Sequence, residues 1–289
     1  MPLGDSELIL NSDGSIYHLN LLPGDIASTI IFVGDPNRVE MVSKYFDTIE
    51  VRKQKREFLT HTGVLHGKRL SVISTGIGAG NIDIVLNELD ALFNIDFSTR
   101  KVKPTITSLQ IIRIGTSGAI QPNIPVDTFV LSKYAIGLDG MLHFYENEKA
   151  EVQNLTNALI HHLNWNTFGI HPYTSMADEK LLNTLKSDRI LEGVTATNGG
   201  FYAPQGRELR LSPRLKDFHS KLASFTYQGA SITNLEMETA AIYSLSRLLG
   251  HKAASLNAIL ANRSLGTFSK QPQKTVDTLI QLALELLSK

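Results

Sequence analysis

The 289-residue sequence contains no cysteine. Disulfide bonds, zinc sites with thiolate ligands and a cysteine nucleophile are therefore excluded. The nine histidines also lack the HxxxH or HxH spacing of a metal site. The adjacent pair His161-His162 would point about 100° apart on a helix, so the two rings could not share an ion. We predict no metal site.

Neither sign of charge is in excess, since Lys plus Arg and Asp plus Glu both number 28. Proteins that bind nucleic acid or anionic membranes usually carry a basic excess, so neither partner is expected. An anionic ligand would have to be held by a few well-placed arginines.

Long apolar runs are also missing. No stretch approaches the ~18 apolar residues of a membrane-spanning helix. The first residues include Asp5 and Glu7 and lack the basic start and apolar core of a secretory signal. We therefore expect a soluble, cytoplasmic protein.

Short β-forming runs alternate with helical patterns along nearly the whole chain. The predicted strands are 29–33, 70–74, 110–114, 128–131, 169–171, 194–197 and 253–260. The predicted helices are 38–46, one that follows Gly80, 236–249 and 275–287. Unbroken alternation predicts one α/β domain over residues 1–289, with three α/β/α layers around a central mixed β-sheet. The polar and basic stretch 94–108 is predicted to be a surface excursion.

Three of these strands are followed by glycine-rich segments, which we interpret as turns. They are Gly34-Asp35-Pro36, residues 76–80 and residues 115–118. Backbone N–H groups at the carboxyl ends of strands can hold an anion. Tight turns also need glycine for steric reasons alone. The three segments leave an anion site and a purely structural role equally open.

The segment 76–80 is not a dinucleotide-binding fingerprint, because Asn81 occupies the place of the third glycine. The chain also lacks the Gly-Lys-Ser/Thr loop of triphosphate hydrolases. We therefore reject a nicotinamide cofactor and do not expect nucleotide hydrolysis.

Arg113 lies inside the apolar run 111–114. A buried charge there needs a partner, which could be an internal ion pair or a bound ligand. Because Thr116 and Ser117 follow at once, a cradle for phosphate is the better interpretation.

Two further clusters are ambiguous when taken alone. Carboxylates such as Glu236 and Glu238 are favoured at the start of a helix, yet one could also bind a vicinal diol. In the segment 201–207, Gln205 and Arg207 could read a planar heterocycle while Phe201 packs on its face. For both clusters a structural role is the simpler explanation on spacing alone.

Taken in order, these motifs resemble the nucleoside phosphorylase-I family. They are Gly-Asp-Pro-x-Arg at 34–38, Thr-Gly-Ile-Gly at 75–78, the run RIGTSGAIQP at 113–122 and Glu-Met-Glu at 236–238. Within the family the chain is most similar to the uridine-cleaving branch, through Leu138-Asp139-Gly140, the 201–207 segment and Asn262-Arg263. The resemblance covers residues 17–289.

The resemblance implies a phosphate site and a ribose site. Phosphate would be bound by Gly34, Arg38, Arg113 and Thr116, together with Arg56 from a neighbouring subunit. Ribose would be bound by Met237 and Glu238, and by His18 from the neighbour. Taken by itself, His18 would be interpreted as a surface residue.

The resemblance also implies a base pocket formed by Ser117, Gly118, Phe201, Gln205 and Arg207. The implied reaction is the reversible phosphorolysis of uridine to uracil and ribose 1-phosphate, with inorganic phosphate as co-substrate and no cofactor. Arg113, Glu238, Gln205 and Arg207 are the implied catalytic residues. They would stabilise an oxocarbenium-like sugar, the attacking phosphate and a leaving uracil anion.

The main reason to choose a pyrimidine is the residue at one position. Purine-cleaving relatives carry an acidic Asp after the last strand, whereas this chain has Asn262 followed by Arg263. A purine nucleoside phosphorylase, a nucleosidase and a non-catalytic nucleoside-binding protein remain the alternatives. Three arginines directed at an anion argue against the nucleosidase, and the presence of Arg113 and Glu238 argues against the binding protein.

The expected assembly is a homo-oligomer, either a dimer or a hexamer built of dimers. A preference for uridine, deoxyuridine or thymidine is left open.

Overall fold

The computed structural model describes residues 2–146, 152–165 and 171–289. The strands of its main sheet are β1 (Thr29–Val33), β2 (Thr48–Lys55), β3 (Phe58–Leu65), β4 (Lys68–Ser74), β7 (Gln110–Ala119), β8 (Phe129–Leu138), β9 (Tyr173–Met176), β10 (Ile190–Asn198), β11 (Thr226–Tyr227), β12 (Ala230–Glu236), β13 (Lys252–Asn262) and β14 (Thr267–Phe268). They form one mixed sheet in the order β11-β12-β10-β8-β13-β7-β1-β4-β3-β2, with β9 beside β8 and β14 beside β13.

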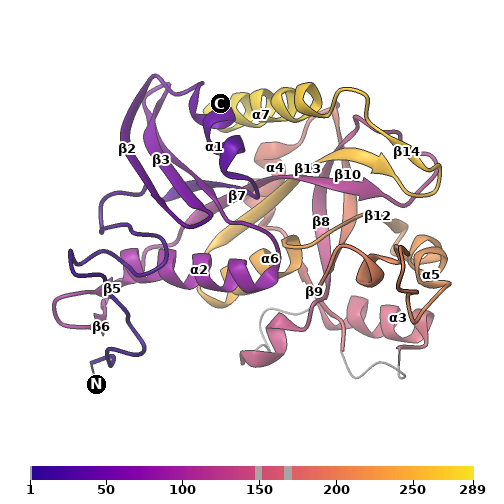
Figure 1. Cartoon of the computed structure of the whole chain (residues 1–289), viewed down its shortest axis with the longest axis horizontal. Helices are drawn as coiled ribbons and strands as arrows, with labels where there is room; N and C mark the ends of the chain where they lie inside the picture. The colour runs from indigo at the N-terminus through magenta and orange to yellow at the C-terminus, as the bar shows by residue number, and fades with distance from the viewer. Residues whose placement is uncertain (1, 147–151, 166–170) are drawn as a thin grey trace.

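Helices cover both faces of this sheet. They are α1 (Pro36–Ser43), α2 (Ala79–Asn94), α3 (Gln153–Leu163), α4 (Glu179–Leu185), α5 (Phe218–Ser224), α6 (Thr239–Leu248) and α7 (Pro272–Ser288). α1, α4 and α7 pack on one face and α2 and α6 on the other, while α3 and α5 lie near β9 and β12 (Figure 1). The predicted three-layer α/β architecture with a central mixed sheet is confirmed.

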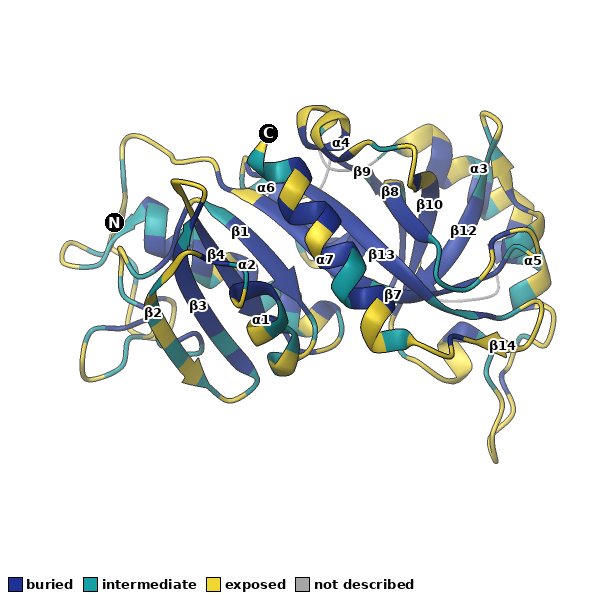
Figure 2. Cartoon of the chain, turned by 90° about the horizontal axis from the view of Figure 1, so that it is seen from above, coloured by how far each residue is buried: buried dark blue, intermediate teal, exposed yellow. Residues whose placement is uncertain are grey.

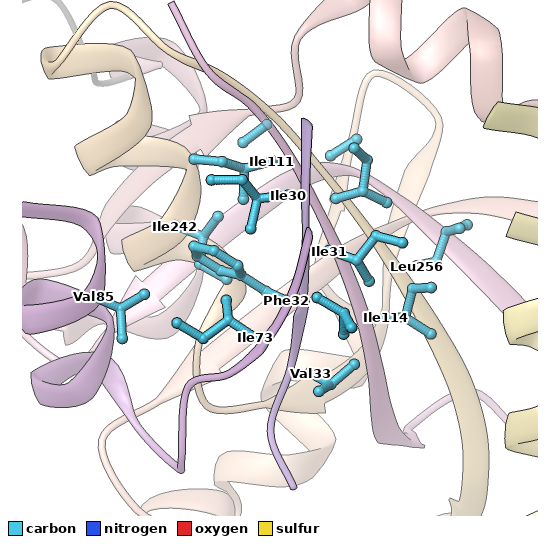
Figure 3. Close-up of a cluster of buried hydrophobic side chains, with 14 of the residues drawn as sticks. Ile30, Ile31, Phe32, Val33, Ile73, Val85, Ile111, Ile114, Ile242 and Leu256 are labelled. Carbon is cyan, nitrogen blue, oxygen red and sulfur yellow. The ribbon is translucent and has the colours of Figure 1, made fainter. Parts of the chain in front are cut away.

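The core is centred on β1, whose last four residues are all buried. Phe32 points toward Ile73, Val85 and Ile242 on one side of the strand, and Ile31 lies on the other side (Figure 3). A strand buried on both faces forms a continuous apolar run, which is why the sequence pattern located it correctly. Figure 2 shows the same burial along β7 and β13.

The parallel strands β4, β1, β7 and β13 lie side by side in the sheet. Their carboxyl ends therefore meet at one edge. The segments that follow β1 and β4 begin at Gly34 and Thr75, so the first two glycine-rich segments lie at this edge, as the sequence indicated.

The third glycine-rich segment is not a turn, and the prediction that its strand ends at Ile114 was wrong. β7 continues to Ala119 because β13 pairs with it along its whole length, as far as Asn262 beside Ala119. β12 also pairs antiparallel with Gly118 and Ala119. This second pairing closes β7, β13, β8, β10 and β12 into a ring and brings the end of β12 against β7.

The predicted start of helix 236–249 was also wrong. Glu236 is the last residue of β12, where it pairs with Thr197 of β10, and α6 begins at Thr239. The Glu236 carboxylate accepts hydrogen bonds from the backbone N–H groups of Glu238 and Thr239. Its side chain therefore caps the helix from outside it.

Apart from the strand predicted over 169–171, whose described residue His171 is not in a strand, the remaining predicted helices and strands are present, most of them with shifted ends. α1 ends at Ser43 rather than 46, and α7 begins at Pro272 rather than 275. Residues 169 and 170 of the strand predicted over 169–171 lie outside the described residues. Among the described helices, none has the length and apolarity to cross a bilayer.

The stretch 94–108 is mostly exposed and includes a small hairpin of β5 (Ile95–Asp96) and β6 (Lys101–Val102). Arg100 in its turn donates hydrogen bonds to the carbonyl oxygens of Leu3, Gly4 and Leu8. The hairpin thereby holds the N-terminal segment against the body of the protein.

Candidate active site

A cavity of about 960 Å³ opens where the ends of β1, β4, β7, β12 and β13 meet. Eleven residues predicted from the sequence line it: Gly34, Arg38, Arg113, Thr116, Ser117, Gly118, Phe201, Gln205, Arg207, Met237 and Glu238. Two predicted residues, His18 and Arg56, do not. The cavity has an inner end around Arg113 and Glu238, and a base-side end around Gln205 and Arg207.

Arg113 is buried and forms an ion pair with carboxylates. Its Nη2 lies 2.6 Å from Oε2 of Glu238 and 3.2 Å from Oε2 of Glu236, and its Nη1 donates to Oδ1 of Asn257 at 2.8 Å. A Cβ at residue 115 would lie 1.8 Å from Nη1, so Gly115 provides the space for the guanidinium. Both interpretations of Arg113 from the sequence are thus compatible with its position, since the ion pair exists and the side chain lines the cavity.

The ionisation of this cluster reflects its burial. Burial acts to lower the pKa of Arg113, but Glu236 and Glu238 outweigh it and the pKa lies above its ordinary value. Burial raises the pKa of the Glu238 carboxyl, an effect that Arg113 opposes and Glu236 reinforces. The guanidinium is therefore charged at all ordinary pH values, and the Glu238 carboxyl takes up a proton at a higher pH than an exposed glutamate does.

The anion side of the inner end is completed by Arg38. Asp35 caps α1 by accepting a hydrogen bond from the N–H of Asn37, and Pro36 occupies the first turn, which places Arg38 at the cavity. Burial, and then the charge of Arg113, lower the pKa of Arg38. Two guanidinium groups that repel each other in one cavity favour an anion between them.

The base-side end is built on the short 3₁₀ helix η3 (Ala203–Gln205) and the residues beside it. Gln205 is buried, and its Oε1 accepts a hydrogen bond from Arg207 at 2.5 Å. Arg207 also donates to the carbonyl of Phe201 at 2.6 Å and lies over the Phe201 ring at 3.7 Å. Arg263 donates to the carbonyl of Gln205 at 3.1 Å. These contacts hold the amide and the two guanidinium groups together.

Burial, with the charge of Arg263 second, lowers the pKa of Arg207 to about 10. The guanidinium still carries its charge at neutral pH. A ligand that develops negative charge at this end would relieve the repulsion between Arg207 and Arg263.

His18 and Arg56 lie elsewhere on the subunit. The Nδ1 of His18 is 2.6 Å from Oε1 of Glu88 on α2, and the same carboxylate accepts the N–H groups of His18 and Leu19. Arg56 lies in the turn between β2 and β3, where its side chain is exposed and its φ is +53°. The subunit does not bring these two residues to its own cavity.

Sequence reasoning missed several lining residues. Glu57 and Asn81 line the cavity, and Asn81 donates to Oε1 of Glu57 at 3.2 Å. Glu236, which the sequence analysis left ambiguous beside Glu238, lines it as well. Arg263 and Phe268 line it near β14. A signal for Arg263 was available, because it directly follows β13 at the edge where ligands bind in α/β sheets.

Asn262, which guided the choice of base, points away from the cavity. Its Nδ2 donates to the carbonyls of Gln121 and Ile124, and its Oδ1 accepts the N–H of Leu265. Its amide therefore has a structural role, and the neighbouring Arg263 is the residue that reaches the cavity.

The chain was compared with known proteins. It matches the Phosphorylase superfamily over residues 28–288. It is 32% identical to a uridine phosphorylase of Thermococcus kodakarensis over 279 residues, which are 96% of this chain and 88% of the relative. It is 25% identical to a DeoD-type purine nucleoside phosphorylase of Bacillus velezensis over 94% of this chain and 99% of the relative.

A solved structure with a similar fold is that of a Trypanosoma brucei nucleoside phosphorylase described as showing uridine phosphorylase activity. The TM-score is 0.87 and the identity 29%, over 97% of this chain and 99% of that one. The match with the family extends over nearly all of the described fold, including every strand around the cavity. The chain therefore belongs to the Phosphorylase superfamily.

Proposed function

We propose that the protein catalyses the reversible phosphorolysis of uridine to uracil and ribose 1-phosphate. The observation that carries the proposal is that two clusters of side chains line one cavity. Arg38, Arg113 and the buried carboxylate of Glu238 lie at its inner end, and Gln205 with Arg207 at its base-side end. They match the anion, the sugar diol and the base edge of the two substrates.

Phosphate binds at the inner end between Arg38 and Arg113, with the backbone of Gly34 and the hydroxyl of Thr116 as further partners. Guanidinium groups in a site sheltered from water hold a phosphate oxygen far more strongly than they would in solution. Phosphate is a co-substrate, and the reaction requires no cofactor. Its oxygen attacks C1′ as the glycosidic bond breaks.

Ribose lies against Met237, and its hydroxyl groups donate hydrogen bonds to the Glu238 carboxylate. The carboxylate already accepts the N–H of Gly78 at 2.8 Å and the guanidinium of Arg113, so its position is defined before substrate arrives. A fixed carboxylate orients the sugar over the nucleophile and stabilises the positive charge that develops on it.

Uracil occupies the base-side end, with Phe201 beside its face and Ser117 and Gly118 lining the pocket. Gln205 and Arg207 donate to the carbonyl oxygens of the base. As the bond to C1′ breaks, the electron pair moves onto uracil, and the charge of Arg207 stabilises the anion on its oxygens.

A panel of nucleosides tests this assignment. Uridine should be cleaved in the presence of phosphate with a kcat/KM roughly 10⁴-fold above that for inosine, because a site built for hydrogen bonds rejects a base that leaves them unpaired. Release of free base is measured with and without phosphate. Comparable rates for inosine would instead favour a purine nucleoside phosphorylase, and release without phosphate would favour a nucleosidase.

We also propose that the active form is a homo-oligomer in which Arg56 and His18 complete the cavity of a neighbouring subunit. Arg56 is exposed on its own subunit, His18 is partly exposed, and neither lines its own cavity. Mixing inactive Arg56→Ala with inactive Arg113→Ala should restore activity, because a mixed pair contains one site with neither substitution. No recovery after subunit exchange, or a fully active monomer in sedimentation, would contradict the shared site.

A further inference from the structure

Glu236 is a buried carboxylate in the wall of the cavity that the proposed reaction does not use. Its side chain is only 2% exposed. An ionised carboxylate in such a place is unfavourable unless it is fully hydrogen-bonded or paired with a cation. Its partners therefore indicate what it does.

These partners belong to three separate elements. Thr197 of β10 donates to Oε1 at 2.5 Å. The N–H of Glu238, and the N–H and hydroxyl of Thr239, donate to Oε2 at 3.0, 2.9 and 2.9 Å. Arg113 of β7 approaches Oε2 to 3.2 Å. One carboxylate thus joins the arginine of the inner end to the backbone that carries Glu238.

We infer that Glu236 is a positioning residue that holds Arg113 and Glu238 in a fixed relation and limits how strongly the inner end binds phosphate. The inference rests on the proposed function, in which Arg113 contacts phosphate and Glu238 contacts ribose. If the two groups shifted independently, the attacking oxygen and C1′ would lose their alignment, and displacements of about 1 Å can cost 10²-fold in rate.

The second effect follows from charge. Glu236 and Glu238 are close enough to Arg113 to raise its pKa, and Arg113 in turn lowers the pKa of Arg38. Two carboxylates against two guanidinium groups leave the inner end close to neutral before phosphate binds. Glu236 therefore weakens the attraction for a dianion, which helps phosphate and ribose 1-phosphate to leave.

The decisive variant is Glu236→Gln, which keeps the size of the side chain and removes its charge. The amide NH₂ of the glutamine can donate a hydrogen bond to the Thr197 hydroxyl. Its amide oxygen can accept the backbone N–H groups of Glu238 and Thr239. We expect phosphate to bind about threefold to tenfold more tightly, because one negative charge beside Arg113 is gone. We expect kcat with uridine to fall about tenfold to 100-fold, because the arginine loses one of its two charged anchors.

Phosphate affinity is measured by calorimetry with inorganic phosphate alone, and kcat in parallel. A residue that only stabilised the fold would lower the melting temperature and leave phosphate affinity unchanged or weaker, and either outcome would overturn the inference. Asp178→Ala is the matched control. Asp178 caps α4 by accepting the N–H of Leu181, so its loss should lower the melting temperature without changing either quantity.

Glu236→Asp provides a second variant if the glutamine variant does not fold. It keeps the charge but shortens the side chain by one methylene. Phosphate affinity should then stay at the level of the unaltered protein while kcat falls. A variant with unchanged kcat would count against the positioning role.

Failure of the inference can be told apart from failure of the proposed function. If the unaltered protein binds phosphate but does not cleave uridine, the proposed function is wrong, and the phosphate affinities of the two Glu236 variants still decide the charge effect. If the unaltered protein cleaves uridine but Glu236→Gln does not combine tighter phosphate binding with a lower kcat, only the inference is wrong.

Discussion

The two ends of the cavity are built in different ways. The inner end is carried by β7, β12 and the start of α6, and its charged residues Arg113, Glu236 and Glu238 are each less than 8% exposed. The base-side end is carried by the 3₁₀ helix Ala203–Gln205, in which Gln205 is buried, and by neighbouring residues such as the half-exposed Phe201. The first end is held by paired strands of the sheet, and the second by local hydrogen bonds within residues 201–207 and by Arg263, which follows β13.

This difference separates chemistry from selectivity. A cluster of charges needs fixed geometry and exclusion of water to act on a reaction, which only the centre of the sheet provides. Recognition of a base needs a few donors on a segment whose sequence can vary, which is the usual property of loops. The comparison predicts that substitutions at the inner end affect stability and every substrate, whereas substitutions at the other end affect the choice of base.

The largest effect is expected from Arg113→Ala. It leaves two buried carboxylates without their cation, which should lower the free energy of unfolding by about 3–5 kcal/mol. In the fraction that remains folded, kcat/KM should still fall by about 10²–10³, because an electrostatic donor at the reacting centre is lost. Urea unfolding and kinetics on the same preparation separate the two effects.

Arg113→Lys should recover little activity, because an ammonium group cannot reproduce a guanidinium held by three side chains. Lys186→Ala removes one partner of an exposed ion pair with Glu192 and is the control, with almost no expected effect. If folded Arg113→Ala retained near-native activity and phosphate KM, the arginine would be structural only.

A smaller effect is expected from Gln205→Ala at the other end. It removes a donor to the leaving base, so kcat/KM for uridine should fall about tenfold to 100-fold. Phosphate affinity should not change, because Gln205 does not belong to the inner end. Steady-state kinetics and calorimetry check both statements, with exposed Gln153→Ala as control. A loss of phosphate affinity would break the proposed division between the ends.

The smallest effect is a shift of the pH at which activity is lost on acidification. The raised pKa of Glu238, caused first by burial and opposed by Arg113, means that its carboxylate is protonated at a higher pH than an exposed glutamate. Only the ionised form can accept hydrogen bonds at both oxygens and oppose the positive charge that develops on the sugar. Activity should therefore be complete above this pKa and be lost as the pH falls through it.

The measurement is kcat/KM for uridine against pH. Glu236 and Arg38 also face this carboxylate, and Arg113 remains charged throughout. Glu238→Gln should show low activity that no longer declines as the pH falls. If the same decline at low pH remained in that variant, another group would be its cause.

Much of the fold could be predicted from the chain. The buried strand at Thr29–Val33 and the alternation of strands and helices are local patterns of hydrophobicity, and they required no knowledge of distant residues. The motifs around Gly34, Arg113 and Glu238 also located the edge of the sheet at which the cavity lies. Residue type and spacing carry this information directly.

The ends of elements could not be predicted in the same way. Whether β7 stops at Ile114 or continues to Ala119 depends on its pairing with β12 and β13, which lie more than a hundred residues away. Glu236 looked like the first residue of a helix because a carboxylate there suits the helix dipole. It is a strand residue because β10 pairs with it.

Sequence alone therefore determined the α/β architecture and eleven of the residues that line the cavity, because apolar periodicity and turn chemistry are local. Tertiary structure decided their partners. It made Arg113 the centre of an ion cluster, turned Asn262 away from the cavity and placed Arg263 in it. Contacts of this kind depend on strand register and on the closure of the sheet through β12. Many distant residues set these together, and no short motif encodes them.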